Sequence, residues 1–163
     1  MADKKISALT SVSSLAGADT FPVVQSGATK KADLNDVLNL VPAYVMIECY
    51  DVEDTGLTTD TVVKTFRMPF AMTVTEVRAS IKAAGSGTGP TTIDINEGGT
   101  SILSTKITID NEEKTSTTAA TPAVISDSAL ADDAEITIDI DGVTTGGTET
   151  GLIVYLIGTR TAV

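Results

Sequence analysis

Closely spaced carboxylates are the side chains of this sequence that best suit catalysis. The closest sets are Asp94 with Asn96, Glu112 with Glu113, Asp132 with Asp133, and Asp139 with Asp141. Two carboxyl groups about 5–9 Å apart can act as acid and base in glycoside hydrolysis. Asp94, Asp139 and Asp141, however, alternate with isoleucines, which places them on the polar face of a strand. We therefore expect a solvated acidic surface here and not a catalytic centre.

The same carboxylates are the candidates for a metal site. Segments 94–99 and 139–142 set oxygen ligands beside glycine turns. Neither segment has the spacing of the calcium loop D-x-[DN]-x-[DN]-G-x5-E. The glycine-rich segment 85–89 lacks the Lys-Ser/Thr end of a phosphate-binding loop, and it precedes a strand instead of a helix. We expect neither a metal nor a cofactor.

Composition restricts nucleophilic chemistry. The chain has no histidine, so Ser-His pairs, Cys-His pairs and His-ligated metal sites are excluded. The single cysteine, Cys49, lies in the apolar stretch 45–50. It cannot form an intrachain disulfide, and we expect a buried, unreactive thiol. Aromatic residues make up 4% of the chain and tryptophan is absent, which leaves few platforms for stacking sugars or bases.

Charge divides the chain into two parts. Residues 1–42 hold four basic and four acidic side chains, so the net charge of −11 falls on residues 43–163. An acidic body repels phosphate backbones, so we expect no nucleic-acid partner. The longest apolar run, Leu152–Ile157, is far shorter than the roughly 20 residues that cross a bilayer, so we expect no membrane partner. Pro42 is the predicted boundary between an arm, 1–42, and a body, 43–163, because proline cannot continue a helix.

The pattern of the arm predicts a small hairpin and a short helix. Phe21–Gln25 reads as a strand, residues 26–27 as a turn, and residues 30–32 as the returning chain. Asp33 suits the N-cap of the helix that follows. The apolar face of this helix, at helical spacing, consists of Leu34, Val37, Leu38 and Val41. This face packs either against the body of the same chain or against another protein.

The pattern of the body predicts an all-β fold. The candidate strands are 43–51, 61–67, 72–82, 91–96, 101–104, 106–110, 134–141 and 152–158. Several alternate isoleucine with polar residues, as Ile136, Ile138 and Ile140 do, which gives each strand one apolar face and one acidic face. Because glycine-rich turns connect these short strands, we predict a two-sheet antiparallel sandwich of jelly-roll type, with an immunoglobulin-like sandwich as the alternative.

Two segments depart from this alternation. Leu152–Ile157 is apolar throughout, which is typical of the central strand of a sandwich or of a strand at a subunit interface. Phe66 and Phe70 stand close together around Pro69 at the end of a strand. There they pack onto the core or form the corner of an interface. The sequence leaves both pairs of alternatives open.

Two parts of the sequence resemble proteins of tailed-bacteriophage virions. Many fibre and head-appendage proteins open with a leader K-I-S-x-L…D-x-x-x-V-V…G-x-T-K-K, which is similar to segments 4–10 (KKISALT), 18–24 (ADTFPVV) and 27–31 (GATKK). Phage head-decoration and head-fibre domains resemble segments 66–70 (FRMPF) and 73–80 (TVTEVRAS) and the threonine-rich strands. The sequence has no heptad or collagen-like repeat that would form a shaft, so a short knob on a capsid suits it better than a tail fibre.

The resemblance implies a non-enzymatic capsid decoration protein or short head fibre on the outer surface of the virion. In such proteins the N-terminal module usually attaches to the major capsid protein, and the β-domain projects outward, commonly as a homotrimer. Under this hypothesis the capsid-docking contacts come from Phe21, Val23, Val24, Leu34, Val37, Leu38 and Val41. The subunit interface would draw on Leu152, Val154, Tyr155, Leu156, Phe66 and Phe70.

Two other functions stay open at this point. The first is a tail-associated fibre or adhesin whose loops Gly85–Pro90 and Thr144–Thr150 bind a host-surface ligand. The second is a polysaccharide depolymerase that uses Asp/Glu pairs. The position of labelled protein on the head or the tail of particles separates the first function from decoration, and sugar release by the purified protein tests the second.

Overall fold

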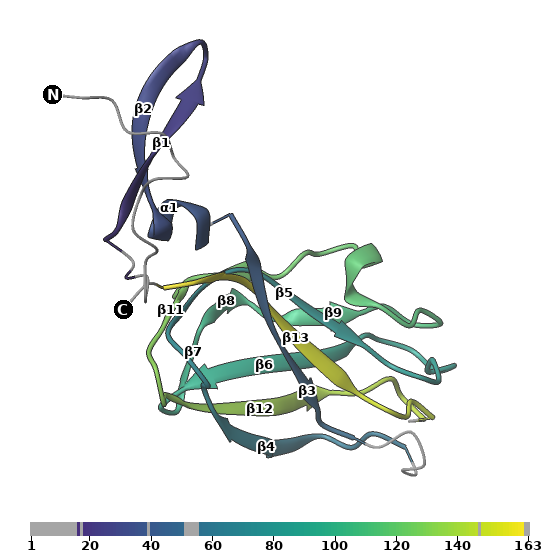
Figure 1. The fold of residues 1–163 in the computed structure, drawn as a ribbon. Helices are drawn as coiled ribbons and strands as arrows, with labels where there is room; N and C mark the ends of the chain where they lie inside the picture. Colours follow the sequence, from purple (N-terminus) through teal and green to yellow (C-terminus); the bar gives the residue numbers. More distant parts are fainter. Residues whose placement is uncertain (1–15, 17, 39, 51–55, 147, 162–163) are drawn as a thin grey trace, which may run out of the picture.

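Antiparallel β-strands make up most of the chain (Figure 1). The computed structural model describes residues 16, 18–38, 40–50, 56–146 and 148–161. The leader segment 4–10 lies outside the described residues, as does Asp51, the last residue of the first predicted body strand. Within these ranges, no helix has the length and apolar character that crossing a membrane requires.

Two sheets form the body. The first has the strand order β11-β5-β13-β3, with β11 at Ala129–Leu130, β5 at Met72–Ser80, β13 at Ile153–Arg160 and β3 at Pro42–Glu48. The second has the order β4-β12-β6-β7, with β4 at Asp60–Arg67, β12 at Glu135–Gly142, β6 at Thr91–Glu97 and β7 at Thr100–Ser101. Smaller elements are β9 (Ile107–Ile109), which also pairs with β6, the pair β8 (Leu103–Thr105) and β10 (Val124–Ile125), and the 3-10 helix η2 (Ser116–Thr118).

The hydrophobic core lies between the facing sides of the two sheets. In the second sheet, Ile138 on β12 stands opposite Ile95 on β6, and Ile140 stands opposite Ile93, all four with 1% exposure or less. The first sheet contributes Val74, Val77, Ala79, Val154 and Leu156 to the same core. Burial of each leucine or isoleucine favours folding by about 1.5–3 kcal/mol relative to leaving it exposed.

The predicted all-β fold is confirmed. Each predicted body strand has a counterpart within a few residues, but the predicted strand 101–104 is divided between β7 and β8. The sequence pattern did not indicate β10 and β11, which have two residues each. Both lie in the stretch 115–131, where alanine, serine and threonine show no period-two alternation.

The apolar run near the C-terminus is a central strand. β13 pairs with β5 on one side and with β3 on the other. Val154 and Leu156 point into the core, and Tyr155 and Ile157 lie half-buried on the outer face of the same sheet. The run fails to alternate because the outer positions are apolar as well.

The described part of the arm contains a β-hairpin. β1 (Thr20–Gln25) and β2 (Ala28–Asp33) pair antiparallel, and Gln25 stands opposite Ala28. Ser26 and Gly27 form the two-residue turn with φ values of 53° and 78°, the left-handed conformations of the tightest hairpin turns. The predicted strand and turn are confirmed. In Figure 1 the hairpin stands clear of the body.

A short helix follows the hairpin. α1 covers Leu34–Leu38. Asp33 Oδ1 accepts a hydrogen bond from the N–H of Asp36 at 2.9 Å, and Asp36 Oδ2 accepts one from the N–H of Asp33 at 3.0 Å, which confirms the predicted N-cap. The helix was expected to reach Val41, and this is wrong. Pro42 begins β3 and disfavours a helical conformation in the residue before it, so the chain leaves the helix earlier.

Candidate functional site

The carboxylates of β6 and β12 form a hydrogen-bonded network. Asp94 is 4% exposed, and its Oδ1 accepts hydrogen bonds from Ser101 Oγ at 2.6 Å and from the N–H of Ile95 at 2.8 Å. Lys106 Nζ lies 3.0 Å from Asp94 Oδ2 and 2.7 Å from Asp141 Oδ2. The hydrogen bond with Asp141, and then that with Asp94, raises the pKa of Lys106. The expected solvated surface is therefore wrong for Asp94, which is buried and paired with a cation.

Asp139 stabilises an irregular stretch of β4. Its Oδ2 accepts a hydrogen bond from Asn96 Nδ2 at 2.9 Å, and its Oδ1 accepts one from the N–H of Val62 at 2.8 Å. Val62 has a φ of 63°, a left-handed conformation that is rare for a β-branched residue, and it lies where the register of β4 against β12 shifts. Because both carboxylate oxygens hold donors of the chain itself, this arrangement indicates a structural role for Asp139.

The candidate metal ligands and the cysteine can be placed wherever the structure describes them. Within the described ranges, no three His, Cys, Asp or Glu side chains lie close enough together to hold a metal ion. Cys49 is half-buried, and its thiol donates to Ile47 O at 3.8 Å. Burial raises the pKa of Cys49 to about 12, against a smaller lowering by Lys64. The thiol is therefore protonated at neutral pH and a poor nucleophile.

A buried carboxylate joins the loops at one end of the body. Glu149 is 0% exposed, and its Oε1 accepts hydrogen bonds from Thr91 Oγ1 at 3.0 Å and from the N–H of Thr144 at 2.8 Å. Its Oε2 has no hydrogen-bond partner among the described residues. A Cβ on Gly85 would overlap Thr144 Oγ1, so glycine allows the two loops to meet here. This contact was not predicted, since one glutamate in a Thr/Gly-rich loop has no periodic neighbours.

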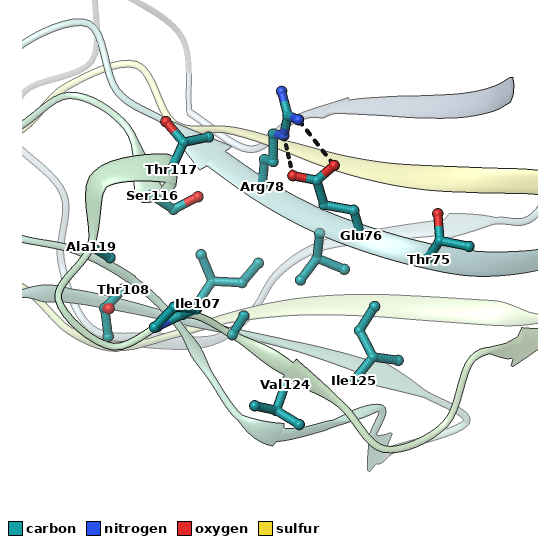
Figure 2. Close-up of a pocket in the computed structure, with 13 residues that line it drawn as sticks. Thr75, Glu76, Arg78, Ile107, Thr108, Ser116, Thr117, Ala119, Val124 and Ile125 are labelled. Carbon is teal, nitrogen blue, oxygen red and sulfur yellow. Dashed lines mark hydrogen bonds and ion pairs between the residues drawn. The ribbon is translucent and has the colours of Figure 1, made fainter.

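A groove of about 730 Å³ lies beside β5 (Figure 2). Its sides are β5, β9 and the segment 116–125, which contains η2 and β10. Figure 2 shows polar side chains along one wall and aliphatic side chains along the other: Glu76, Arg78 and Thr117 against Ile107, Val124 and Ile125. Sequence analysis missed this groove because segments far apart in the chain combine to form it.

An ion pair marks the polar wall of the groove. Arg78 Nε lies 2.6 Å from Glu76 Oε1, and Arg78 Nη2 lies 2.9 Å from Glu76 Oε2. This two-pronged geometry fixes both side chains. The hydrogen bond from Arg78 lowers the pKa of Glu76, so the carboxyl group is ionised at neutral pH. The two charges cancel, and the wall has dipoles and hydroxyl groups but no net charge.

Most of the predicted docking residues of the arm are exposed. The exposed fractions are 38% for Phe21, 76% for Val24, 40% for Val37, 58% for Val41 and 80% for Leu40, which the prediction did not include. Val23 and Leu34 are half-buried, and the side chain of Leu38 lies outside the described part of the chain. A shallow hollow of about 340 Å³ lies on the hairpin beside Phe21, Lys30 and Lys31.

Three of the residues predicted for a subunit interface lie in the core instead. Leu152, Val154 and Leu156 are 0% exposed within their own chain, so they present no surface to another subunit. This corrects the prediction for these three, and Tyr155 on the outer face of β13 can still contact a partner. On the neighbouring edge strand β3, Met46 stands opposite Tyr155 and is 58% exposed.

Tyr44 extends this outer apolar surface. It is 72% exposed and stands opposite Ile157. The alternation of Tyr44 and Met46 with the inward-facing Val45 and Ile47 could have indicated this surface, since large apolar residues occupy both faces of the strand. We use the name outer patch for Tyr44, Met46, Tyr155 and Ile157.

Phe66 and Phe70 belong to the edge of the core. Both are half-buried and pack against the core cluster. The guanidinium of Arg160 lies 5.0 Å from the centre of the Phe70 ring, a cation–π contact. Of the two alternatives for these phenylalanines, this placement favours packing on the core.

The two loops predicted to bind a host ligand lie together. The N–H of Thr145 donates to Thr88 O at 2.9 Å, and Ala83 and Thr150 form a β-bridge. In Figure 1 these loops lie at the end of the body away from the arm. The surface formed by these loops and the surface of the arm therefore lie at opposite ends of the molecule (Figure 1).

Comparison with known proteins identified no relative of this chain. The chain matches no family model, and no match was found among curated proteins or solved structures.

Proposed function

We propose that this chain is a non-enzymatic structural protein of a bacteriophage virion. It is a capsid decoration protein or short head fibre that docks on the major capsid protein through its arm and projects its β-body outward. The observation that carries this proposal is the exposure of apolar arm residues, above all Val24, Leu40 and Val41. Covering such side chains with another protein gains about 25 cal/mol per Å² of apolar surface.

The charge distribution supports docking through the arm. The arm has equal numbers of basic and acidic side chains, whereas the body holds the net charge of −11. A neutral arm approaches another protein without the repulsion that the body would meet on an acidic surface. The acidic body stays solvated and discourages aggregation of the particles.

The strand order supports a jelly-roll body. The chain moves from β3 in the first sheet to β4 in the second, back to β5, and again to β6. It later passes from β11 through β12 to β13, which places β12 between β4 and β6, and β13 between β5 and β3. Two Greek keys that span both sheets produce this order. Jelly rolls are a frequent architecture of viral capsid domains, which agrees with a virion role.

The carboxylate contacts support a structural role more than a depolymerase. Asp94, Asp139 and Asp141 all accept hydrogen bonds from donors of the same chain. An acid–base pair needs carboxyl groups that can reach a substrate and exchange protons with it. A decoration protein that binds the assembled shell but not its separate subunits stabilises the shell against dissociation, because binding shifts the equilibrium toward the assembled state.

The outer patch supports self-association into the proposed homotrimer. Its members, Tyr44, Met46, Tyr155 and Ile157, have no charge. Copies that each carry −11 repel one another, so they can approach most easily at the uncharged patch, which borders the Glu76–Arg78 ion pair, whose charges cancel. The patch therefore replaces the buried residues of β13 as the proposed subunit contact. Sedimentation of the Tyr44→Glu variant tests it, and an unchanged trimer would exclude this contact.

Co-sedimentation with purified capsids that lack the protein tests the proposed function. The two samples are the full chain and a version that begins at Pro42, which keeps all of β3. We expect only the full chain to bind, while the thermal unfolding of the body, which both versions share, occurs at the same temperature in the two samples. If neither version binds capsids, the head assignment is wrong.

A tail-associated adhesin is the second candidate. The observation that favours it is the pairing of the two loops through Thr88 and Thr145 at the end away from the arm. A surface at that end could meet a host ligand while the arm holds the virion. Labelled protein seen on tails, and not on heads, would establish this candidate over decoration.

A further inference from the structure

The outer edge of β5 has a gap in its hydrogen bonding. At one end of the strand, the N–H of Ile81 donates to Lys114 O at 3.0 Å and the N–H of Ala79 donates to Ser116 Oγ at 2.9 Å. At the other end, the N–H of Val74 donates to Ser128 O at 2.7 Å, and Thr73 pairs with Ala129 of β11. Between these contacts no strand is hydrogen-bonded to this edge of β5 in the described part of the chain.

Val77 stands in this gap. Backbone groups alternate in direction along an antiparallel strand, so the N–H and C=O of Val77 point to the same side as the N–H groups of Ala79 and Ile81. That side is away from β13, where Val77 stands opposite Leu156. Neither group of Val77 has a hydrogen-bond partner among the described residues on this side. A strand edge with such open groups is a template for another strand.

The groove lies over this gap. Val77 is one of its lining residues, and the gap covers residues 75–78, a length of about 13 Å in an extended chain. The ends of the slot are closed by Ser116 and Ser128, which already bond to β5. The length of the gap therefore matches about four residues of an extended segment.

The walls define the side chains of the occupant. A strand laid along β5 directs alternate side chains to opposite sides. One set would meet the aliphatic wall of Ile107, Val124 and Ile125, and the other set would meet the polar wall of Glu76 and Arg78 (Figure 2). Because the charges of Glu76 and Arg78 neutralise each other, neither an acidic nor a basic side chain is attracted. Aliphatic residues alternating with serine or threonine match these walls.

We propose that the groove binds an extended, uncharged peptide segment of a partner protein as an added strand beside β5. Val77 donates and accepts the central backbone hydrogen bonds, and one or two aliphatic side chains of the segment cover Ile107 and Ile125. This is recognition by strand addition, in which main-chain bonds give affinity and the walls give selectivity. The proposal is independent of the virion role, since it concerns the body and not the arm.

Amide hydrogen exchange on the full chain tests the open edge first. Val74 and Ile81 are internal controls because their N–H groups lie on the same edge and are paired. We expect the Val77 amide to exchange at least about tenfold faster than these two in the free protein. Equal protection of all three amides, at low protein concentration, would show that the edge is already paired and would overturn the proposal.

Titration with a synthetic peptide tests the occupant. The probe is acetyl-Ser-Val-Thr-Val-Ser-amide, followed by NMR of the full chain. We expect it to slow exchange at Val77 and to shift the resonances of Ile107 and Val124. The same peptide with its backbone amides N-methylated cannot donate to a strand edge, so we expect no binding. Equal binding of the methylated peptide, or shifts confined to other parts of the chain, would overturn strand addition.

A variant and a matched control complete the test. Val124→Asp places a charge on the aliphatic wall, where Val124 is 50% exposed, and is expected to weaken peptide binding at least about tenfold. Thr59→Asp adds the same charge at an exposed position that does not line the groove, and it should leave binding unchanged. If protection of Val77 rises with protein concentration without peptide, a second copy fills the groove, and the proposal of a peptide partner is wrong.

Discussion

The arm and the body place their apolar side chains in opposite environments. In the body, isoleucines at every second position of β6 and β12 meet across the strand pair and are fully buried. In the arm, Val24 and Leu40 are 76% and 80% exposed, although the sequence around them has the periodicity of ordinary strands and helices.

The difference between the two regions is the presence of a covering layer. Each sheet of the body has a second sheet against its apolar face, whereas no second sheet covers the hairpin β1–β2 within the described residues, where the short helix α1 adjoins it. A two-stranded hairpin has marginal stability by itself in water. Apolar residues that do not complete the core of their own chain are available to a partner, which is the basis for assigning docking to the arm.

The largest expected effect on stability is the difference between two leucine variants, one in each region. Leu156→Ala removes a side chain that is 0% exposed, and we expect a loss of about 2–5 kcal/mol in the free energy of unfolding. Leu40→Ala removes one that is 80% exposed, and the expected change is within about 0.5 kcal/mol. Urea denaturation measures both. Equal losses would contradict the contrast between the regions.

Close strand packing in the body gives the next largest effect. A Cβ on Gly158 would overlap Thr73 O of β5, so Gly158→Ala must displace backbone and is expected to cost about 1–3 kcal/mol. Gly142→Ala, in β12 of the other sheet, is the control, since its Cβ would lie 3.5 Å from Thr92 Oγ1, an ordinary contact. Thermal unfolding should show a large shift for the first variant and a small one for the second.

Removal of the ion pair between Lys106 and Asp94 is expected to have a smaller effect. Lys106→Met leaves Asp94 without its cation, and we expect a loss of about 1 kcal/mol, because the Lys106 side chain is 42% exposed and screened by water. The raised pKa of Lys106 stabilises the fold fully below the ordinary lysine value of 10.5, and this contribution is lost as the pH rises through the folded pKa.

The pH dependence of this variant is a separate readout. The difference in unfolding free energy between the natural chain and Lys106→Met should be constant near neutral pH and should shrink above about pH 10.5. Lys64→Met, at an exposed position of β4, is the control and should change little. A difference that persists at high pH would contradict the assignment.

The smallest effect on global stability is expected in the arm. Asp33→Ala removes the acceptor for the N–H of Asp36, a cap worth about 0.5–2 kcal/mol to a helix. Because α1 does not belong to the core, we expect the loss to appear in the NMR shifts of the arm and not in the unfolding of the body. A drop in the melting temperature of the body would show that the arm stabilises it.

The sequence correctly predicted the strands in which apolar and polar residues alternate with a period of two. The strands with isoleucine at alternate positions were located, because one face of each is buried. The apolar run of β13 was ambiguous, since periodicity alone cannot tell which of Leu156 and Tyr155 faces the core. The end of α1 was misplaced because the effect of Pro42 on the residue before it outweighed the helical spacing.

The candidate sites were less predictable than the fold. Asp94 is buried because Lys106 and Ser101, from the chain that follows β6, reach it, and the alternation of β6 alone does not indicate this. The groove depends on segment 116–125 lying beside β5, and that segment has no period to interpret. Both features depend on contacts between segments that are distant in the sequence.

Binding of two valine variants to capsids tests the central claim most directly. Val24→Asp puts a charge on the exposed surface of the arm, and Val62→Asp puts one on the body at a residue that is 53% exposed. Aspartate also accepts the left-handed backbone of Val62 better than valine does, so the body should stay folded. We predict that Val24→Asp lowers the amount that co-sediments with capsids at least about tenfold and that Val62→Asp leaves it unchanged. Undiminished binding of Val24→Asp, with loss of binding by Val62→Asp, would contradict docking through the arm.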